Sequence, residues 1–260
     1  MSGAVDGGAP VLLSVADGVA HVELNRPDAS NTIDLPWTEA FTSALQQVSD
    51  DDTVRVVLLT GRGRMFCAGG DLGAMDAAPD RSAYLQELAD ALHVGVRLLD
   101  GLDKPVVVGV HGAAAGAGLS LVLGGDLVVA GRSASFVTAY TSVGLTPDGG
   151  QSWLLPRVVG LQRALELTLT PRRLSADEAQ EWGIVGRVVE DEAVADEAHA
   201  LARRLADGPA AAFGRARRLL RSSYDTGLSD RLDVEARTIA ASVAEPESAA
   251  LITRFLSPRR

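Results

Sequence analysis

Two loops rich in glycine and alanine offer backbone amides, rather than side chains, as groups that could do chemistry. One is HGAAAGAGLS, from His111 to Ser120, and the other is FCAGGDL at 66–72; each follows an apolar run. Residues with little or no side chain let a ligand approach the main chain closely. A helix that starts near Ala117 would also direct free N–H groups and its positive dipole end toward an anion. Tight packing of a strand against a helix is the alternative explanation for either loop alone.

The common cofactor, nucleophile and metal motifs are missing. HGAAAGAGLS contains neither the Gly-Lys-Ser/Thr of a phosphate-binding loop nor the G-x-G-x-x-G of a dinucleotide site. Ser120 lacks the glycine two residues later that a nucleophile elbow needs. A single cysteine, Cys67, excludes an intramolecular disulfide and a structural zinc site, and we expect it to be a small buried hydrophobe. The histidines are scattered along the chain: His21, His93, His111 and His199. We therefore expect no metal and no redox cofactor.

Composition argues against several classes of partner. The chain has 260 residues, of which 47% are hydrophobic, so it can bury a sizeable core. Its 24 basic and 34 acidic residues give a net charge of −10, which argues against nucleic acid or an anionic membrane as the main partner. The sequence MSGAVDGGAP resembles no signal peptide, and no apolar run reaches the roughly 20 residues of a membrane helix. We expect a soluble, cytoplasmic protein.

Strand–loop–helix units recur through the first 190 residues and position both loops. VLLSVADGVAHVEL, at 11–24, predicts two strands with a turn at Asp17-Gly18. Helical spacing over 35–50 places four apolar residues on one face: Trp37, Phe41, Leu45 and Val48. Ser175 and Glu178 form a capping box for a helix through Trp182. The other expected elements follow in order: a strand at 54–61, a Gly-rich loop at 61–75, a helix at 84–102, a strand at 106–110, a short helix through 120–125, a strand at 126–131 that continues extended to 137, a helix from about 149, and a strand at 186–190.

The pattern changes near residue 191, where alanine, arginine and leucine begin to dominate and no strand signal returns. We therefore expect a flexible tail at 1–10, an α/β core at 11–190 and a helical region at 191–260.

Five blocks of sequence resemble the enoyl-CoA hydratase/isomerase (crotonase) superfamily, with motifs closest to its isomerase-type members. They are ELNRPDASNT at 23–32, LLTGRGRMFCAGGDL at 58–72, DKPVVVGVHGAAAGAGLSLVLGGDLVVAG at 103–131, GLTPDGGQSWLLPRVVG at 144–160 and LSADEAQEWGIVGRVV at 174–189. The blocks keep the family's order and spacing over almost the whole chain. The resemblance implies a crotonase-like α/β fold, which is a spiral of repeated ββα units with a C-terminal helical region that forms a homotrimer or a dimer of trimers.

The resemblance also implies a substrate and an oxyanion hole. Family members bind an acyl-CoA thioester and stabilise an enolate with two backbone N–H groups, which map to Gly70 and Ala117. Losing one such donor typically costs about 100- to 1000-fold in rate. The CoA thioester is the substrate, and no further cofactor is implied.

Two acids of the family's hydratases have no counterpart here. Their positions are occupied by Ser120 and Tyr140, and neither side chain can act as a carboxylate base near neutral pH. Asp148, in LTPDGG, matches the catalytic carboxylate of several isomerases of the superfamily. An N-cap for the helix that follows is the alternative role for Asp148. Tyr140 is expected to line the acyl pocket, by filling space or by donating a hydrogen bond, and Ser120 to be a small helix residue.

Residues that contact CoA are less well specified. By resemblance, Arg26 belongs to the CoA-contacting loop, and three residues line the nucleotide end: Ala29, Ala68 and Leu72. Asp71 is expected to order the first loop, and Phe255 to pack near bound CoA.

The sequence favours an enoyl-CoA double-bond isomerase with Asp148 as the proton shuttle. One carboxylate can remove a proton from one carbon and return it to another while the oxyanion hole holds the dienolate. Two alternatives stay open: an enoyl-CoA hydratase with non-standard acids, and a non-catalytic acyl-CoA-binding protein.

Overall fold

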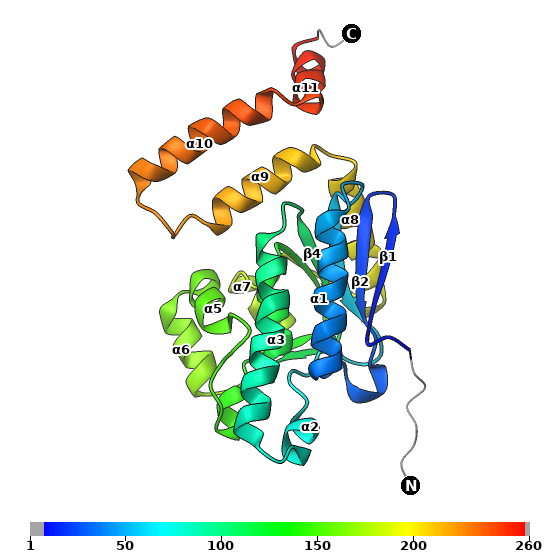
Figure 1. Cartoon of the computed structure of the whole chain (residues 1–260), viewed down its shortest axis with the longest axis vertical. Coiled ribbons are helices and arrows are strands. Elements are labelled where there is room, and N and C mark those ends of the chain that lie inside the picture. The colour runs from blue at the N-terminus through cyan, green and yellow to red at the C-terminus, as the bar shows by residue number, and fades with distance from the viewer. Residues whose placement is uncertain (1–7, 258–260) are drawn as a thin grey trace.

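Two β-sheets are built from alternating strands of the chain (Figure 1). The computed structural model describes residues 8–257. The larger sheet has the order β1-β2-β3-β4-β6-β9, in which only the pair β1/β2 is antiparallel. Its strands are β1 (Val11–Ala16), β2 (Val19–Leu24), β3 (Val56–Gly61), β4 (Val106–Val110), β6 (Leu127–Gly131) and β9 (Arg187–Val189). The smaller sheet contains β5 (Ala113–Ala115), β7 (Ser135–Val137) and β8 (Leu174–Ser175).

The larger sheet buries side chains on both of its faces. Successive side chains of a strand point to opposite faces, so one strand contributes to two clusters. In β3, Val57 and Leu59 belong to the main core, whereas Val56 and Leu58 face a second cluster. Helices α1 (Leu35–Asp50) and α3 (Arg81–Gly101) lie side by side over the first face (Figure 1). Helix α8 (Val194–Ala206) covers the second face with its buried alanines. The continuous apolar runs in the sequence follow from this double burial.

Each turn of the chain adds one strand to the larger sheet, a short extended segment to the smaller sheet, and then a helix. Strand β3 is followed by Cys67, which pairs with Ala114 of β5, and then by α2 (Leu72–Ala77) and α3. Strand β4 is followed by β5 and α4 (Ala117–Gly124), and β6 is followed by β7, α5 (Gln151–Val159) and α6 (Leu161–Leu169). The expected crotonase-like spiral of ββα units is confirmed.

Local patterns predicted most elements correctly. Asp17 and Gly18 both have positive φ, 51° and 76°, as the tight hairpin turn requires. Helix α1 spans the expected residues, and the capping box of Ser175 and Glu178 begins α7 (Ala176–Glu181). One detail of the expectation was wrong: the loop expected at 61–75 contains the start of the short helix α2. The segment expected to be extended as far as 137 does form a strand, β7, and this strand belongs to the smaller sheet.

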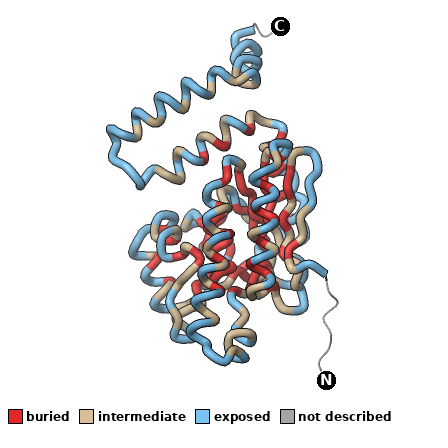
Figure 2. The backbone as a smooth tube through the Cα atoms, viewed as in Figure 1, coloured by how far each residue is buried: buried red, intermediate tan, exposed pale blue. Residues whose placement is uncertain are grey.

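Three helices end the described part of the chain, and the last two of them extend away from the core. They are α9 (Ala210–Arg221), α10 (Leu228–Val243) and α11 (Pro246–Leu256), and Figures 1 and 2 show α10 and α11 projecting from the body of the chain. Neither α10 nor α11 contains a buried residue. The tail expected at 1–10 falls mostly outside the described residues.

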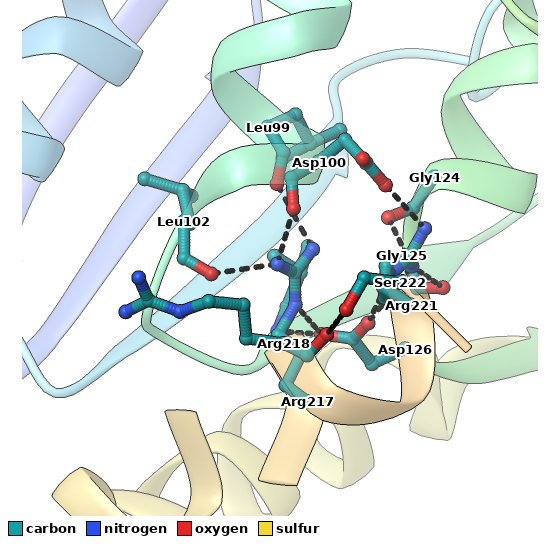
Figure 3. A network of polar contacts seen from close by, with 11 residues as sticks. Leu99, Asp100, Leu102, Gly124, Gly125, Asp126, Arg217, Arg218, Arg221 and Ser222 are labelled. Carbon is teal, nitrogen blue, oxygen red and sulfur yellow. Dashed lines mark hydrogen bonds and ion pairs between the residues drawn. The ribbon is translucent and has the colours of Figure 1, made fainter. Parts of the chain in front are cut away.

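Arginines of α9 attach this region to the core (Figure 3). Arg217 is buried, and its guanidinium donates to Asp126 at 2.6 Å and to three backbone carbonyls near the end of α3. Arg221 donates to the other oxygen of Asp126 and to the carbonyls of Gly124 and Gly125. These cations lie where the C-terminal ends of α3 and α4 leave carbonyls without helical partners.

No helix among the described residues is long and apolar enough to cross a membrane. Residues 8–257 likewise contain no group of three or more His, Cys, Asp or Glu side chains arranged to hold a metal ion.

Candidate active site

The spiral stacks the two glycine-rich loops on each other. Gly70 follows Cys67 just before α2, and Ala117 follows β5 as the first residue of α4. A Cβ atom on Gly69 would lie 2.8 Å from the oxygen of Ala115, and one on Gly118 would lie 2.3 Å from the oxygen of Cys67. Such distances are too short for a side chain. The small residues therefore do pack tightly, and this packing brings the two candidate amides into one place.

Both candidate amides are available to a ligand. The hydrogen bonds around Gly70 are made by its neighbours, since Ile33 N–H donates to the oxygen of Gly69 and Asp71 N–H donates to the oxygen of Ile33. The amides of Gly70 and Ala117 donate to no other residue within the described part of the chain. Ala117 also stands at the N-terminus of α4, where the helix dipole favours negative charge.

A cavity of about 130 Å³ opens beside these amides. Its wall is mainly apolar, and it includes residues of α3, the first loop, α4 and the segment 139–148. Six of the residues singled out from the sequence line it: Ala68, Gly70, Asp71, Leu72, Ala117 and Tyr140. Asp148 lines the same cavity.

Tyr140 and Asp148 form a direct pair. The tyrosine hydroxyl donates to Asp148 Oδ1 at 2.5 Å. Burial, followed by the charge of Asp148, raises the pKa of Tyr140 well above its ordinary value, so the hydroxyl stays protonated and acts as a donor. Asp148 Oδ2 accepts no hydrogen bond from the described residues. One oxygen of the carboxylate is therefore held in place while the other can take a proton.

The N-cap alternative for Asp148 is wrong. The N-cap residue of α5 is Gly150, and no side chain caps this helix. Asp148 contributes only its backbone oxygen, which accepts from Gln151 N–H at 3.1 Å. Its carboxylate is directed to Tyr140 instead.

Ser120 connects the second loop with the segment that carries Asp148. It is buried, and its hydroxyl donates to the backbone oxygen of Asp148 at 3.1 Å and lies 3.5 Å from the hydroxyl of Tyr140. The positions of the two absent acids, 120 and 140, thus hold hydroxyl groups that both contact Asp148. Ser120 is a small buried residue of α4, as expected, and its hydroxyl is hydrogen-bonded to the segment of Asp148.

Asp71 and Arg26 are bound to each other and to the protein. The Asp71 carboxylate caps α2 by accepting a hydrogen bond from Ala74 N–H. It also accepts a hydrogen bond from Thr32 Oγ1 and lies 3.4 Å from Arg26. Burial alone would raise the pKa of Asp71, but these hydrogen bonds and the arginine charge hold it below its usual value. Arg26 also pairs with Asp34 at 3.0 Å. Asp71 orders the first loop, and the guanidinium of Arg26 is engaged inside the protein.

Two other predicted CoA contacts lie away from the cavity. Ala29 is in the short helix η1 (Pro27–Ala29), and Phe255 is in α11 with 87% of its surface exposed. Cys67 is fully buried, as expected, and burial raises the pKa of its thiol to about 12.

Two residues near the site went unrecognised in the sequence. His93, on α3, accepts a hydrogen bond from Gly149 N–H through Nε2 at 3.1 Å. Gln151 donates to the oxygen of Gly116, directly before Ala117. Both contacts join segments that are far apart in the sequence, and no local pattern signals them.

A sequence model for the enoyl-CoA hydratase/isomerase family matches residues 14–260. The chain belongs to this family. Among curated relatives, the 1,2-epoxyphenylacetyl-CoA isomerase of Escherichia coli (strain K12) is 44% identical over 230 residues, which cover 86% of this chain and 87% of the relative. The 4-chlorobenzoyl coenzyme A dehalogenase-2 of an Arthrobacter species is 33% identical over 243 residues, which cover 93% of this chain and 88% of that protein.

Solved structures agree with the family fold. The crystal structure of an enoyl-CoA hydratase from Mycobacterium smegmatis superposes with a TM-score of 0.90 at 32% identity, over 96% of this chain and 97% of that one. Isomerase, dehalogenase and hydratase names thus all occur among the relatives, so the choice of reaction has to come from the site itself.

Proposed function

We propose that the chain is an acyl-CoA isomerase that moves a double bond through an enolate, with Asp148 as its only proton-transfer carboxylate. The observation that carries this proposal is the placement of Asp148 on the wall of the same cavity as the free amides of Gly70 and Ala117. A base and two oxyanion donors around one apolar space are the groups that deprotonation beside a thioester carbonyl requires.

The reaction would proceed in two proton transfers. Asp148 Oδ2 takes a proton from a carbon of the enoyl chain, and the electrons of that C–H bond move through the conjugated system to the thioester oxygen. The amides of Gly70 and Ala117 hydrogen-bond this oxyanion. The electrons then return to form the shifted double bond, and Asp148 gives the proton to a different carbon. Tyr140 keeps Oδ1 fixed throughout.

A second candidate is the isomerisation of 1,2-epoxyphenylacetyl-CoA. It is favoured by the 44% identity to the Escherichia coli enzyme that bears this name. The apolar wall of the cavity, with Leu85, Leu88 and Leu92 on one side, suits an aromatic ring as well as a short alkenyl chain. Both candidates place the acyl group against the same amides.

Hydration is less well supported by the side chains around the cavity. Adding water needs a group that activates the water and an acid that protonates the carbon. Asp71 and Asp148 are the acidic residues that line the cavity, and the carboxylate of Asp71 caps α2. An enoyl-CoA hydratase here would have to use Asp148 for both roles.

A panel of CoA esters tests these possibilities on the wild type and on Asp148→Asn. The substrates are a 3-enoyl-CoA, crotonyl-CoA and 1,2-epoxyphenylacetyl-CoA. We expect turnover of an isomerase substrate and a loss in kcat of roughly 100- to 10,000-fold in Asp148→Asn, because a general base is removed while the side chain keeps its shape. Asp90→Asn, an exposed carboxamide substitution on α3, is the matched control and should retain full activity.

Three results would contradict the proposal. Full isomerase turnover in a folded Asp148→Asn variant would show that Asp148 is not the catalytic base. Rapid hydration of crotonyl-CoA, followed as loss of ultraviolet absorbance, would favour the hydratase. Tight binding of CoA thioesters without turnover of any ester would favour a non-catalytic binding protein.

A further inference from the structure

Gln151 is a buried amide behind the proposed oxyanion site. It is the first residue of α5, three positions after Asp148, and only 1% of its surface is exposed. Its Nε2 donates to the oxygen of Gly116 at 3.1 Å and lies 3.5 Å from the hydroxyl of Ser120. The side chain does not line the main cavity, so it does not reach the space where the acyl group would lie.

The carbonyl that Gln151 contacts belongs to a particular peptide group. The oxygen of Gly116 and the N–H of Ala117 are the two ends of one amide, and this N–H is a proposed oxyanion donor. Gly116 adopts φ 53° and ψ −123°, a conformation that side-chain-bearing residues rarely adopt. The orientation of this peptide is therefore set by its surroundings. A hydrogen bond at its oxygen fixes that orientation.

The same bond also strengthens the donor. A hydrogen bond to a carbonyl oxygen draws electron density away from the amide nitrogen, and hydrogen bonds in a chain polarise one another, most effectively in a buried place. Leu119 N–H and Ser120 N–H donate to the same oxygen at 3.0 and 3.2 Å. Those two bonds come with the start of the helix, whereas the bond from Gln151 depends on one side chain.

The oxygen of the Gln151 side-chain amide, Oε1, is buried and lacks the hydrogen bond that a buried carbonyl usually has, since none of the described residues donates to it. A leucine or methionine would fill a similar volume without leaving a buried oxygen unpartnered. The hydrogen bond to the oxygen of Gly116, at 3.1 Å, is the shorter of the two polar contacts that an apolar residue could not supply; the other is the 3.5 Å contact with the hydroxyl of Ser120.

We propose that Gln151 is a positioning residue that orients and polarises the Gly116–Ala117 peptide, and so strengthens the Ala117 N–H as an oxyanion donor without contacting the acyl group. This inference rests on the proposed function, because it takes the Ala117 amide to be an oxyanion donor. Gln151, together with Ser120, joins the segment of Asp148 to that of Ala117.

The test uses a chromophoric ligand, para-dimethylaminocinnamoyl-CoA, whose absorption band moves to longer wavelength when its thioester carbonyl is polarised. The variants are Gln151→Met, which keeps the length of the side chain without a donor, and Gln151→Glu, which can donate only when protonated. Ser152→Ala, at the next and exposed position of α5, is the control. Thermal unfolding and ligand affinity are measured on each variant.

In Gln151→Met we expect a smaller red shift of the bound ligand and a kcat lower by roughly 3- to 10-fold, the range that one neutral hydrogen bond supports, with little change in KM. In Gln151→Glu the activity relative to wild type should rise as the pH is lowered and the carboxyl becomes a donor. Ser152→Ala should match the wild type in every measurement.

A full red shift in Gln151→Met, with only its thermal stability lowered, would overturn the inference and leave the oxyanion hole standing. If Gln151→Met does not fold, a pH-independent activity ratio for Gln151→Glu would overturn it equally. An absent red shift in the wild type would instead refute the oxyanion hole, and with it both the proposed function and this inference.

Discussion

Replacing Arg217 by methionine should destabilise the protein strongly, because this arginine is a buried cation with a full set of partners. Its side chain is 4% exposed and lies 2.6 Å from Asp126. It also donates to the carbonyls of Leu99, Asp100 and Leu102 at 2.7 to 2.9 Å. Methionine keeps most of the apolar stem but none of the donors.

The expected cost is about 3 kcal/mol. Removing one member of a buried ion pair typically costs about 3–5 kcal/mol, since the other charge is left without its partner. The lower end applies here because Asp126 retains Arg221 at 2.8 Å and is 20% exposed. Arg218, the next residue on the same helix, provides the contrast. Its side chain is 59% exposed and its partner Asp103 is 52% exposed, so Arg218→Met should cost about 0–1 kcal/mol.

Urea unfolding measures this difference. The midpoint and slope are determined for wild type, Arg217→Met and Arg218→Met at one fixed protein concentration, so that any self-association affects all three alike. Equal destabilisation of the two variants, within about 0.5 kcal/mol, would refute the reasoning, because the buried network would then contribute no more than a surface ion pair.

Three other expectations follow from the same structure. Tyr140→Phe should lower kcat by roughly 10- to 100-fold with little change in KM, because the charge-assisted hydrogen bond that orients Asp148 is lost; unchanged kcat would show that the carboxylate needs no such support. Cys67, whose pKa is raised to about 12 by burial, should resist iodoacetamide at pH 8 until the protein is unfolded, and rapid labelling of folded protein, read by mass spectrometry, would contradict its placement. The family resemblance predicts that the chain sediments as a trimer or a dimer of trimers, which would cover apolar side chains that α10 and α11 expose, such as Ile239 (72%) and Phe255 (87%), and a monomer at micromolar concentration would argue against this.

Local signals in the sequence were enough for most helices and strands. Helix α1 shows why: Asp34 caps it, and its apolar residues repeat at helical spacing, so its start and its buried face are both encoded in the helix and the residue before it. The hairpin at Asp17-Gly18 and the capping box at Ser175 are equally local. The family resemblance then supplied what local patterns do not, the arrangement of these elements as a spiral of repeated ββα units.

The parts that could not be predicted depend on contacts between distant segments. Cys67 pairs with Ala114, and this bridge makes the first loop part of the smaller sheet. The sequence left two roles open for Asp148, proton shuttle or N-cap of the helix that follows, and only the packed structure shows that Gly150 is the N-cap residue and that the carboxylate of Asp148 accepts a hydrogen bond from Tyr140. Gln151 looked like an ordinary first residue of a helix, because nothing in the adjacent sequence points to the carbonyl of Gly116.

The hydroxyl groups at positions 120 and 140 bear on the choice of reaction. In a site that adds water, two acids have to face the water and the substrate carbon. Here Ser120 donates to the backbone of Asp148 and Tyr140 donates to its carboxylate, so both hydroxyls are directed at the remaining acid. A water molecule between the hydroxyls of Ser120 and Tyr140 would have to compete with their hydrogen bonds to Asp148. The proposed proton shuttle needs only one carboxylate with a free oxygen, so the pair of hydroxyls at 120 and 140 supports the proposal of an isomerase over that of a hydratase.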